Sequence, residues 1–412
     1  MAAILYRVCA GIDVHAKVLV VALRIDQPDE SPQRLPPRKF GTNHADLVQL
    51  RRWLLDNGCE AVGMESTGVY WKPLYRVLEG SGMKVFVGNA QHLKHVPGRS
   101  KTDKEDAQWL AHLVATGFIK PSFVPTVEHE ELREDMRLRT RFVQLRSNVR
   151  NRITRLLERA GVKLKAVISG FETVTARRIL EALATGETDP ERLARHRQRR
   201  CVHTKEEFVA ALSVEVPDST RRRLRLLLCD EAHLNARIAE LDEQLDVAFA
   251  AMNDAVQRLM TIPGFGQTMA RIVLSEIGTD MSRFGSAQRL ACWSGLSPGN
   301  HQSAGKRRAV GTAKGNRHLR RALVEGAWSL KTSSGWLPDK FRALQARIGG
   351  KKAAVAVAHK LIVVAWHVLN DGVNYDETRY AQRNTQELER RLRRLAMQLR
   401  AHGWTAEPPA VA

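Results

Sequence analysis

The chain has 412 residues, 43% of them apolar, which is enough for two or three domains with buried cores. Lysine and arginine number 65 against 44 acidic residues, so the formal net charge is +21. This excess is larger than solubility needs and indicates a polyanionic partner such as nucleic acid. The five cysteines are scattered without Cys-x-x-Cys or zinc-finger spacing, which argues against a zinc finger or a disulfide framework.

The sequence predicts a first domain at residues 1–125, ending near Pro121 and Pro125. Apolar runs rich in β-branched residues predict strands, and apolar residues that recur at three and four predict helices. Strands are expected near 6–14, 17–25, 38–41, 60–64 and 83–88, and helices near 44–57, 70–80 and 103–116. Strands alternating with helices favour an α/β fold.

Four carboxylates lie at the ends of these predicted elements. Asp13 ends the first strand and Glu65 ends the fourth. Asp103 and Asp106 lie three residues apart in the first turn of a helix that Thr102 or Asp103 can cap, so both carboxylates share one helical face. An Asp-x-x-Asp pair alone is also typical of capping or of a solvated surface. The four acids together indicate a ligand site, because open sheets bind ligands at the ends of their strands.

Carboxylates from three elements suit a site for two divalent cations. Mg²⁺ prefers oxygen ligands, and Mn²⁺ fits the same set. Two such ions stabilise the attacking and the leaving oxygen of a phosphodiester displacement. We therefore expect Asp13, Glu65, Asp103 and Asp106 to bind metal.

Residues 126–252 predict a helical linker built on two long helices. The first, from Glu128 to Ala160, is rich in arginine, and the second runs from about Asp218 to Ala251. An insert at 161–203 with short helices separates them, so a helical hairpin or a dimeric coiled coil is expected. Arg146 and Arg150 are candidates for phosphate contact, although a solvated helix face explains them as well.

A mainly α-helical domain is predicted at 253–372, followed by a basic helical tail at 373–412. The domain opens with Ile-Pro-Gly-Phe-Gly before a helix at 267–277, a pattern typical of a helix-hairpin-helix. The amides of Gly264 and Gly266 would suit a phosphate at a helix N-terminus, or the turn is simply tight.

Ser303 lies in a basic loop of this domain. Cations surround it in the sequence and would stabilise charge on a phosphate under attack by its hydroxyl. By spacing alone an ordinary loop serine is much the commoner explanation of this pattern. The cationic residues nearby, candidates for nucleic-acid contact, are Lys306, Arg307, Arg308, Lys314 and Arg317.

Three segments, AGIDVHAK, GMESTGVYW and GRSKTDKEDA, carry a resemblance. They resemble the N-terminal domain of bacterial insertion-sequence transposases with an Asp-Glu-Asp-Asp tetrad, the bridge-RNA-guided recombinases. The runs IPGFG, HQSAGKRR and KGNRHLRRAL resemble the second domain of that family. The resemblance covers roughly residues 8–125 and 255–330.

The resemblance implies a RuvC-like member of the RNase H fold joined by a coiled-coil linker to a serine transposase domain. By motif position the covalent nucleophile is Ser303, with Ser297 and Ser294 as rivals. It implies a 5′-phosphoserine intermediate, donor and target DNA, a guide RNA whose pairing selects them, and a homo-oligomer, dimer or tetramer, whose protomers complete one another's sites.

Two other functions fit parts of the sequence. A metal-dependent Holliday-junction resolvase or nuclease that uses water as nucleophile needs only the tetrad, and a non-catalytic nucleic-acid-binding protein needs neither the tetrad nor Ser303. No membrane segment is expected, because His359, Lys360 and His367 interrupt the apolar stretch from Ala353 to Leu369. A cytoplasmic protein at the bacterial nucleoid is therefore predicted.

Overall fold

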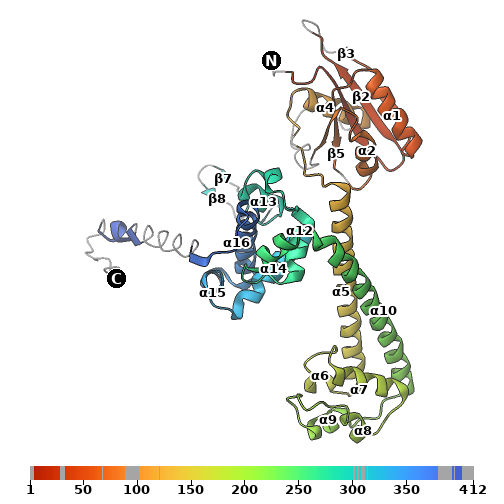
Figure 1. Cartoon of the computed structure of the whole chain (residues 1–412), viewed down its shortest axis with the longest axis vertical. Coiled ribbons are helices and arrows are strands. Elements are labelled where there is room, and N and C mark those ends of the chain that lie inside the picture. Colours follow the sequence, from red (N-terminus) through yellow and green to blue (C-terminus); the bar gives the residue numbers. More distant parts are fainter. Residues whose placement is uncertain are drawn as a thin grey trace. The chain divides into compact units, whose positions relative to one another are not determined.

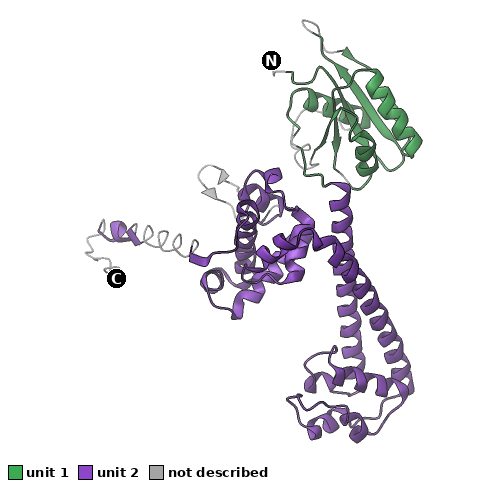
Figure 2. Cartoon of the chain, viewed as in Figure 1, with its two compact units in different colours: residues 1–125 green, residues 126–412 purple. Residues whose placement is uncertain are grey.

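The computed structural model describes residues 4–27, 33–66, 68–88, 102–119, 121–299, 302–303, 306–307, 311–312, 314–378, 392–393 and 395–400. The chain divides into two compact units, Met1–Pro125 and Thr126–Ala412 (Figure 2). The predicted further division of the second unit at 252 and 372 stays a prediction.

A mixed six-stranded sheet forms the centre of the first unit (Figure 1). Strand β1 pairs antiparallel with β2 and parallel with β5, and β5 pairs parallel with β6, while β3 and β4 both pair with β2. The expected α/β architecture is thereby confirmed. The strands are β1 (Val8–Val14), β2 (Leu19–Ile25), β3 (Gln33–Arg34), β4 (Arg38–Phe40), β5 (Ala61–Glu65) and β6 (Lys84–Gly88).

Helices cover both faces of this sheet. Ala10 and Ile12 of β1 lie in the same apolar cluster as residues of α1 (His44–Asp56) and α2 (Trp71–Leu78). Cys9, on the opposite face by strand alternation, clusters with α4 (Asp103–Ala115). The side chain of Asn43 caps α1 by accepting a hydrogen bond from the amide of Asp46 at 2.9 Å.

Glycine lets α4 approach the sheet closely. A Cβ built on Gly11 would lie 2.1 Å from the carbonyl oxygen of Ala107 and 2.3 Å from the amide nitrogen of Ala111. Both atoms are backbone and cannot rotate away. The absence of a side chain at Gly11 therefore sets the distance between β1 and the helix that carries Asp103 and Asp106.

Two long antiparallel helices, α5 and α10, form an arm in the second unit (Figure 1). The prediction of a helical hairpin is confirmed, with bounds within two residues of those expected, and the coiled coil stays a prediction. The insert holds three short helices, and a fourth follows it before α10. These elements are α5 (Val127–Arg159), α6 (Leu164–Val167), α7 (Val174–Thr185), α8 (Pro190–Ala194), α9 (Lys205–Leu212) and α10 (Asp218–Ala250).

Helices dominate the rest of this unit. Its described elements are α11 (Asn253–Met260), α12 (Gln267–Ile277), η1 (Met281–Phe284), α13 (Ala287–Trp293), β7 (Gln302–Ser303), β8 (Lys306–Arg307), α14 (Arg317–Ser329), η2 (Leu330–Thr332), α15 (Trp336–Ile348) and α16 (Gly350–Asp371). Helix α16 is long and apolar enough to cross a membrane, yet half of its most apolar window is buried inside the protein. It packs against α13, α14 and α15, as a core helix does.

Candidate active site

The four candidate acids of the first unit lie near one end of the central strands β1 and β5. Asp13 follows Gly11 on the face of β1 that α4 covers, because side chains alternate along a strand. Parallel pairing matches Gly11 with Gly63, so Glu65 ends the neighbouring strand on the same face. Asp103 and Asp106 lie in the first turn of α4, which contacts both strands.

Local sequence explains why α4 begins there. Thr102 is the N-cap, and its hydroxyl oxygen accepts a hydrogen bond from the Glu105 amide at 3.3 Å. Ala107, Leu110 and Ala111 then bury one stripe of the helix against the sheet. Asp106 lies at the start of this buried stripe and is half-buried, with its Oδ1 atom inaccessible to solvent.

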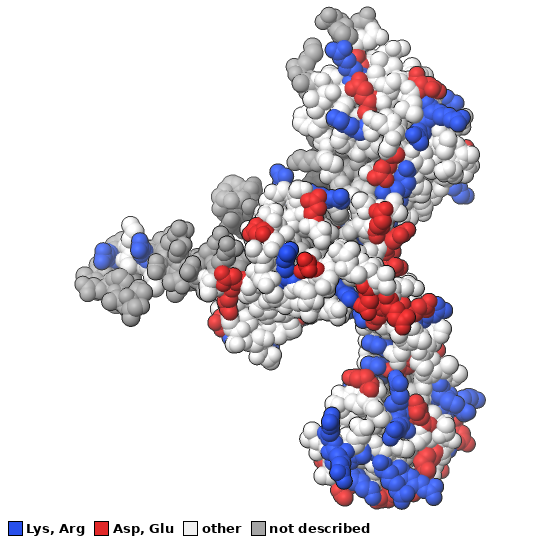
Figure 3. Space-filling view, viewed as in Figure 1, with Lys and Arg blue, Asp and Glu red and all other residues white. Residues whose placement is uncertain are grey.

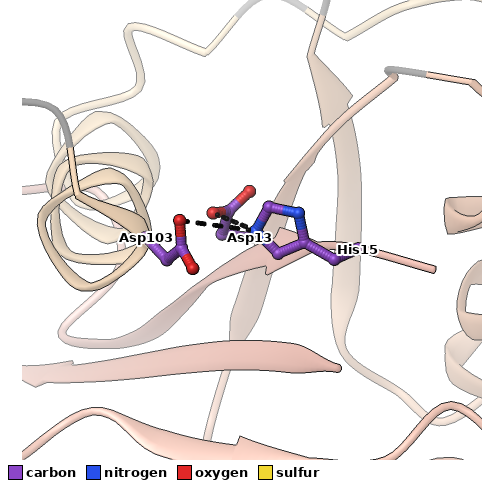
Figure 4. A group of neighbouring side chains, drawn as sticks. All are labelled: Asp13, His15 and Asp103. Carbon is purple, nitrogen blue, oxygen red and sulfur yellow. Dashed lines mark hydrogen bonds and ion pairs between the residues drawn. The ribbon is translucent and has the colours of Figure 1, made fainter. Parts of the chain in front are cut away.

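A histidine lies between two of the carboxylates (Figure 4). The Nε2 atom of His15 is 3.0 Å from Oδ2 of Asp13 and 3.6 Å from Oδ1 of Asp103. His15 belongs to the tight turn between β1 and β2, where its amide donates to the carbonyl of Val18 at 3.1 Å. The structure thus brings the ring of His15 to the two acids.

The electrostatics of Asp13 show how close the carboxylates are. Burial raises the pKa of Asp13 above its usual value of 3.8, and the negative charges of Asp103 and Asp106 raise it further. The contact with His15 offsets part of this rise. Three carboxylates therefore repel one another near this end of the strands, and a cation between them would relieve the repulsion.

The donor atoms suit a divalent cation. One ligand atom from each of Asp13, His15 and Asp103 lies within 4.8 Å of the others. Carboxylate oxygens are the ligands of Mg²⁺ and Mn²⁺, whereas an imidazole nitrogen is a softer donor. The carboxylates could therefore hold such an ion, and the site is compatible with divalent-metal chemistry. Glu65 is half-buried at the end of β5.

The structure separates the three serine candidates of the second unit. Ser294 is fully buried, and its hydroxyl donates to the carbonyl of Ala291 at 2.8 Å. Ser297 is 7% exposed and accepts a hydrogen bond from the Cys292 thiol at 3.3 Å. Both serines are therefore buried in the folded chain. Ser303 lies on β7, where its backbone pairs with that of Lys306 on β8.

The predicted nucleic-acid contacts near Ser303 are only partly described. Lys306 and Arg307 form β8, whereas Arg308 lies outside the described residues. Lys314 is exposed just before α14, and Arg317 begins that helix. Arg317 also lines a cavity of about 450 Å³ between α5, α12 and α14.

The glycines of the predicted hairpin differ in role. Gly264 has a φ of +86°, and a Cβ there would lie 2.9 Å from the carbonyl oxygen of Gly326 on α14. Tight packing thus accounts for Gly264. Gly266 is the N-cap residue of α12, and nothing lies within 4 Å of its built Cβ, so only this side of the turn is open to a ligand.

Arg146 and Arg150 hold the arm together. Arg146 donates to Oδ1 of Asn235 at 3.0 Å. Arg150 pairs with the buried Glu231 at 2.5 Å and with Glu172 at 3.2 Å. These guanidinium groups bind protein atoms in the structure, and their contact with phosphate stays a prediction.

Glu276, which the sequence did not single out, joins three helices. Its side chain is 1% exposed, and it accepts hydrogen bonds from Arg137 of α5 at 2.7 and 2.9 Å. Asn316, the N-cap of α14, donates to Glu276 at 2.6 Å and caps the helix with its own Oδ1. The signal in the sequence was a carboxylate in the last turn of a helix, where the helix dipole disfavours it unless cations are near.

Comparison with known proteins agrees with this picture. Residues 10–161 match the transposase model DEDD_Tnp_IS110, and residues 256–342 match the model of the transposase IS116/IS110/IS902 family. The chain carries two IS110/IS116-type transposase domains. It is a DNA transposase or recombinase enzyme.

Several relatives resemble the transposase over most of its length. The transposase for insertion sequence element IS1111A from Coxiella burnetii is 27% identical, over 77% of this chain and 79% of that protein. The pilin gene-inverting protein of Moraxella bovis is 25% identical, over 82% and 90% respectively. Among solved structures, Thermus thermophilus RuvC matches with a TM-score of 0.24 and 15% identity, covering 28% of this chain and 99% of that one.

Proposed function

We propose that the protein moves a bacterial insertion sequence by cutting and rejoining DNA through a phosphoserine intermediate, directed by a guide RNA. The convergence of Asp13, Asp103 and His15 near the end of β1, in the domain that matches the transposase model, is the observation that carries this proposal. Glu65 and Asp106 complete the tetrad.

The tetrad holds divalent cations, with Mg²⁺ as the expected ion. Such ions, when bound, would stabilise the charge that develops on the scissile phosphate. The carboxylates of Asp13 and Asp103 supply oxygen ligands, and the repulsion that raises the pKa of Asp13 makes the site favour a cation. His15 orients these two carboxylates through its contacts with both.

Ser303 is the nucleophile. Its oxygen attacks the phosphorus, a serine–phosphate bond forms, the bond from phosphorus to the 3′ oxygen breaks, and that oxygen takes up a proton. The burial of Ser294 and Ser297 supports Ser303 among the three candidates. Lys306, Arg307, Arg308, Lys314 and Arg317 provide positive charge around the DNA.

Donor and target DNA are the substrates, and guide RNA selects them by base pairing, which leaves the protein to bind shape and backbone. Because the tetrad and Ser303 belong to different units, a second protomer completes the site in a dimer or tetramer. The enzyme works at the bacterial nucleoid. The resemblance of the quoted motifs supports these statements.

The decisive experiment is mass spectrometry of the protein isolated with its own element, the flanking RNA and Mg²⁺. We expect a peptide that contains Ser303 with a nucleotide covalently attached. The adduct should disappear in Asp13→Ala and in Ser303→Ala. It should persist in the matched controls Asp56→Asn and Ser333→Ala, which alter exposed residues of the same units.

Each other outcome contradicts a different part of the proposal. Cleaved DNA without an adduct would identify water as the nucleophile, as in a metal-dependent resolvase. An adduct that persists in Asp13→Ala would show that the tetrad is dispensable. If the wild type gives neither cleavage nor adduct and Asp13→Ala still binds DNA, the protein would be a non-catalytic binding protein.

A further inference from the structure

The end of the arm, where α5 stops and α10 begins, carries a folded cap. Helices α6 to α9 share a hydrophobic cluster with the adjoining ends of α5 and α10, in which Ile153, Phe208 and Leu224 are fully buried. Neither transposase model matches residues 162–255. This cap, residues 150–228, is therefore a folded element that has no part in the proposed reaction.

Arginines without acidic partners cover the cap. Figure 3 shows lysine and arginine gathered at this end of the unit. In the fully described stretch from 121 to 299, the following arginines are exposed and form no ion pair: Arg152, Arg155, Arg159, Arg177, Arg178, Arg195, Arg199, Arg200, Arg222, Arg223 and Arg225.

Most acidic residues of the cap are already neutralised by other cations. The ion pairs are Glu158 with Lys163, Glu172 with Arg150, Glu187 and Asp189 with Arg192, Glu191 with Lys205, and Asp218 with Arg221. The eleven remaining arginines outnumber the other exposed acids of the cap, Glu181, Glu206, Glu207 and Glu215, and give this surface a net positive charge. A surface built only for solubility has both signs interspersed.

The spacing of these arginines concentrates the charge. Arg152, Arg155 and Arg159 recur at three and four, so they line one stripe of α5 over about 10 Å, given a rise of about 1.5 Å per residue. At 0.1 M salt the Debye length is also about 10 Å, so these charges repel one another. A row of phosphates would remove this repulsion, because duplex DNA carries one charge per about 1.7 Å of its axis.

We propose that the arginine-rich cap binds the phosphate backbone of double-stranded DNA through a surface that includes none of the catalytic residues. Duplex DNA is the partner that its charge fits in a DNA transposase. Contacts to the phosphate backbone do not depend on base sequence, so the cap binds whichever duplex the enzyme engages. The inference does not rest on the phosphoserine mechanism, because binding needs neither Ser303 nor metal.

The test measures the binding of the full-length protein to a fluorescent 30-base-pair duplex without metal, across a series of salt concentrations. The variant changes Arg152, Arg155 and Arg159 to Gln, which keeps helix propensity. The slope of log K against log salt should become shallower by about 2.7, since each lost phosphate contact removes about 0.9. A second variant, with Gln at Arg195, Arg199 and Arg200, should show the same loss without altering a long helix.

A matched control removes three exposed cations elsewhere, with Gln in place of Arg347, Lys351 and Lys352. We expect the wild-type slope from this control and from a variant with Lys at Arg152, Arg155 and Arg159. Wild-type slopes in both cap variants would overturn the inference, and so would an equal loss in the control. A loss seen only with RNA duplexes would identify RNA as the partner and refute the assignment to DNA.

The result is separable from the fate of the proposed catalysis. Asp13→Asn should bind the duplex with the wild-type slope and fail to cleave. If a cap variant keeps the wild-type melting temperature while its slope of log K against log salt becomes shallower, that result supports the cap as a DNA-binding surface, whatever the nucleophile proves to be.

Discussion

Replacing Glu276 with Gln should destabilise the second unit strongly. The change keeps the size of the side chain and removes its charge. Arg137 and Arg133 lie 2.7 Å and 3.4 Å from the carboxylate, and both would then face a neutral amide inside the protein. Burial lowers the pKa of Arg133, which shows how poorly its guanidinium is hydrated there.

The size of the effect follows from how buried the partners are. Breaking a buried ion pair by removing one charge costs about 3–5 kcal/mol. The side chains of Glu276 and Arg133 are 1% and 12% exposed, but that of Arg137 is 29% exposed, so water compensates part of the loss. We therefore expect about 3 kcal/mol, which lowers the melting temperature of a unit this large by about 6–12 °C.

Differential scanning calorimetry of the full-length protein measures this effect. Glu325→Gln is the matched control, because it breaks a pair with Arg321 in which both side chains are more than half exposed. Exposed pairs contribute about 0–1 kcal/mol, so the control should melt within about 4 °C of the wild type. Equal melting temperatures for both variants would refute the view that Glu276 joins α5, α12 and α14.

Four further predictions concern the first unit and the pH dependence of the second. At 100 times its Kd, Mg²⁺ should add about 2.7 kcal/mol to the free energy of unfolding of the wild type and so raise its melting temperature. The melting temperature of Asp13→Asn should not change. Without metal, Asp13→Asn should be the more stable protein at pH 7, because a raised pKa means that folding disfavours the charged form; a lower melting temperature would contradict this. Gly11→Ala should lower the free energy of unfolding in urea by more than about 3 kcal/mol, because its Cβ would overlap backbone atoms of α4. In the control Gly58→Ala the built Cβ meets nothing within 4 Å, so this variant should be destabilised only by the strain of an alanine at positive φ. Burial and nearby arginines lower the pKa of His129 from 6.5 to about 4. As the pH falls from 6.5 toward 4, the unfolded chain binds a proton at this histidine before the folded chain does, so the free energy of unfolding should decrease. His129→Gln should reduce this decrease, and an unchanged pH profile would show that the histidine is hydrated.

Local signals in the sequence were enough for the elements and for the candidate acids. The arginine-rich helix was expected at 128–160 and runs from Val127 to Arg159, and the helix predicted at 267–277 has those bounds. Caps, prolines and apolar periodicity act over a few residues, so they can be read without a structure. The ends of β1 and β5 followed in the same way and carried Asp13 and Glu65.

Contacts between distant segments were decided only by tertiary packing. The sequence placed Arg146 and Arg150 on a basic helix, but α10 and Glu172 determine that they bind protein atoms. Likewise, nothing near Ser294 and Ser297 in the sequence shows that folding buries them. Burial and pairing depend on what other elements bring to a residue.

The sequence by itself thus determined the order of the elements, the excess of positive charge and the residue types of the candidate catalytic motifs. The tertiary structure decided which of these residues meet: His15 lies against Asp13 and Asp103, and Glu276 joins three helices. It also decided that the insert forms a cap with unpaired arginines on its surface. The physical reason is that periodicity and capping act within a segment, whereas proximity in space depends on how all segments pack.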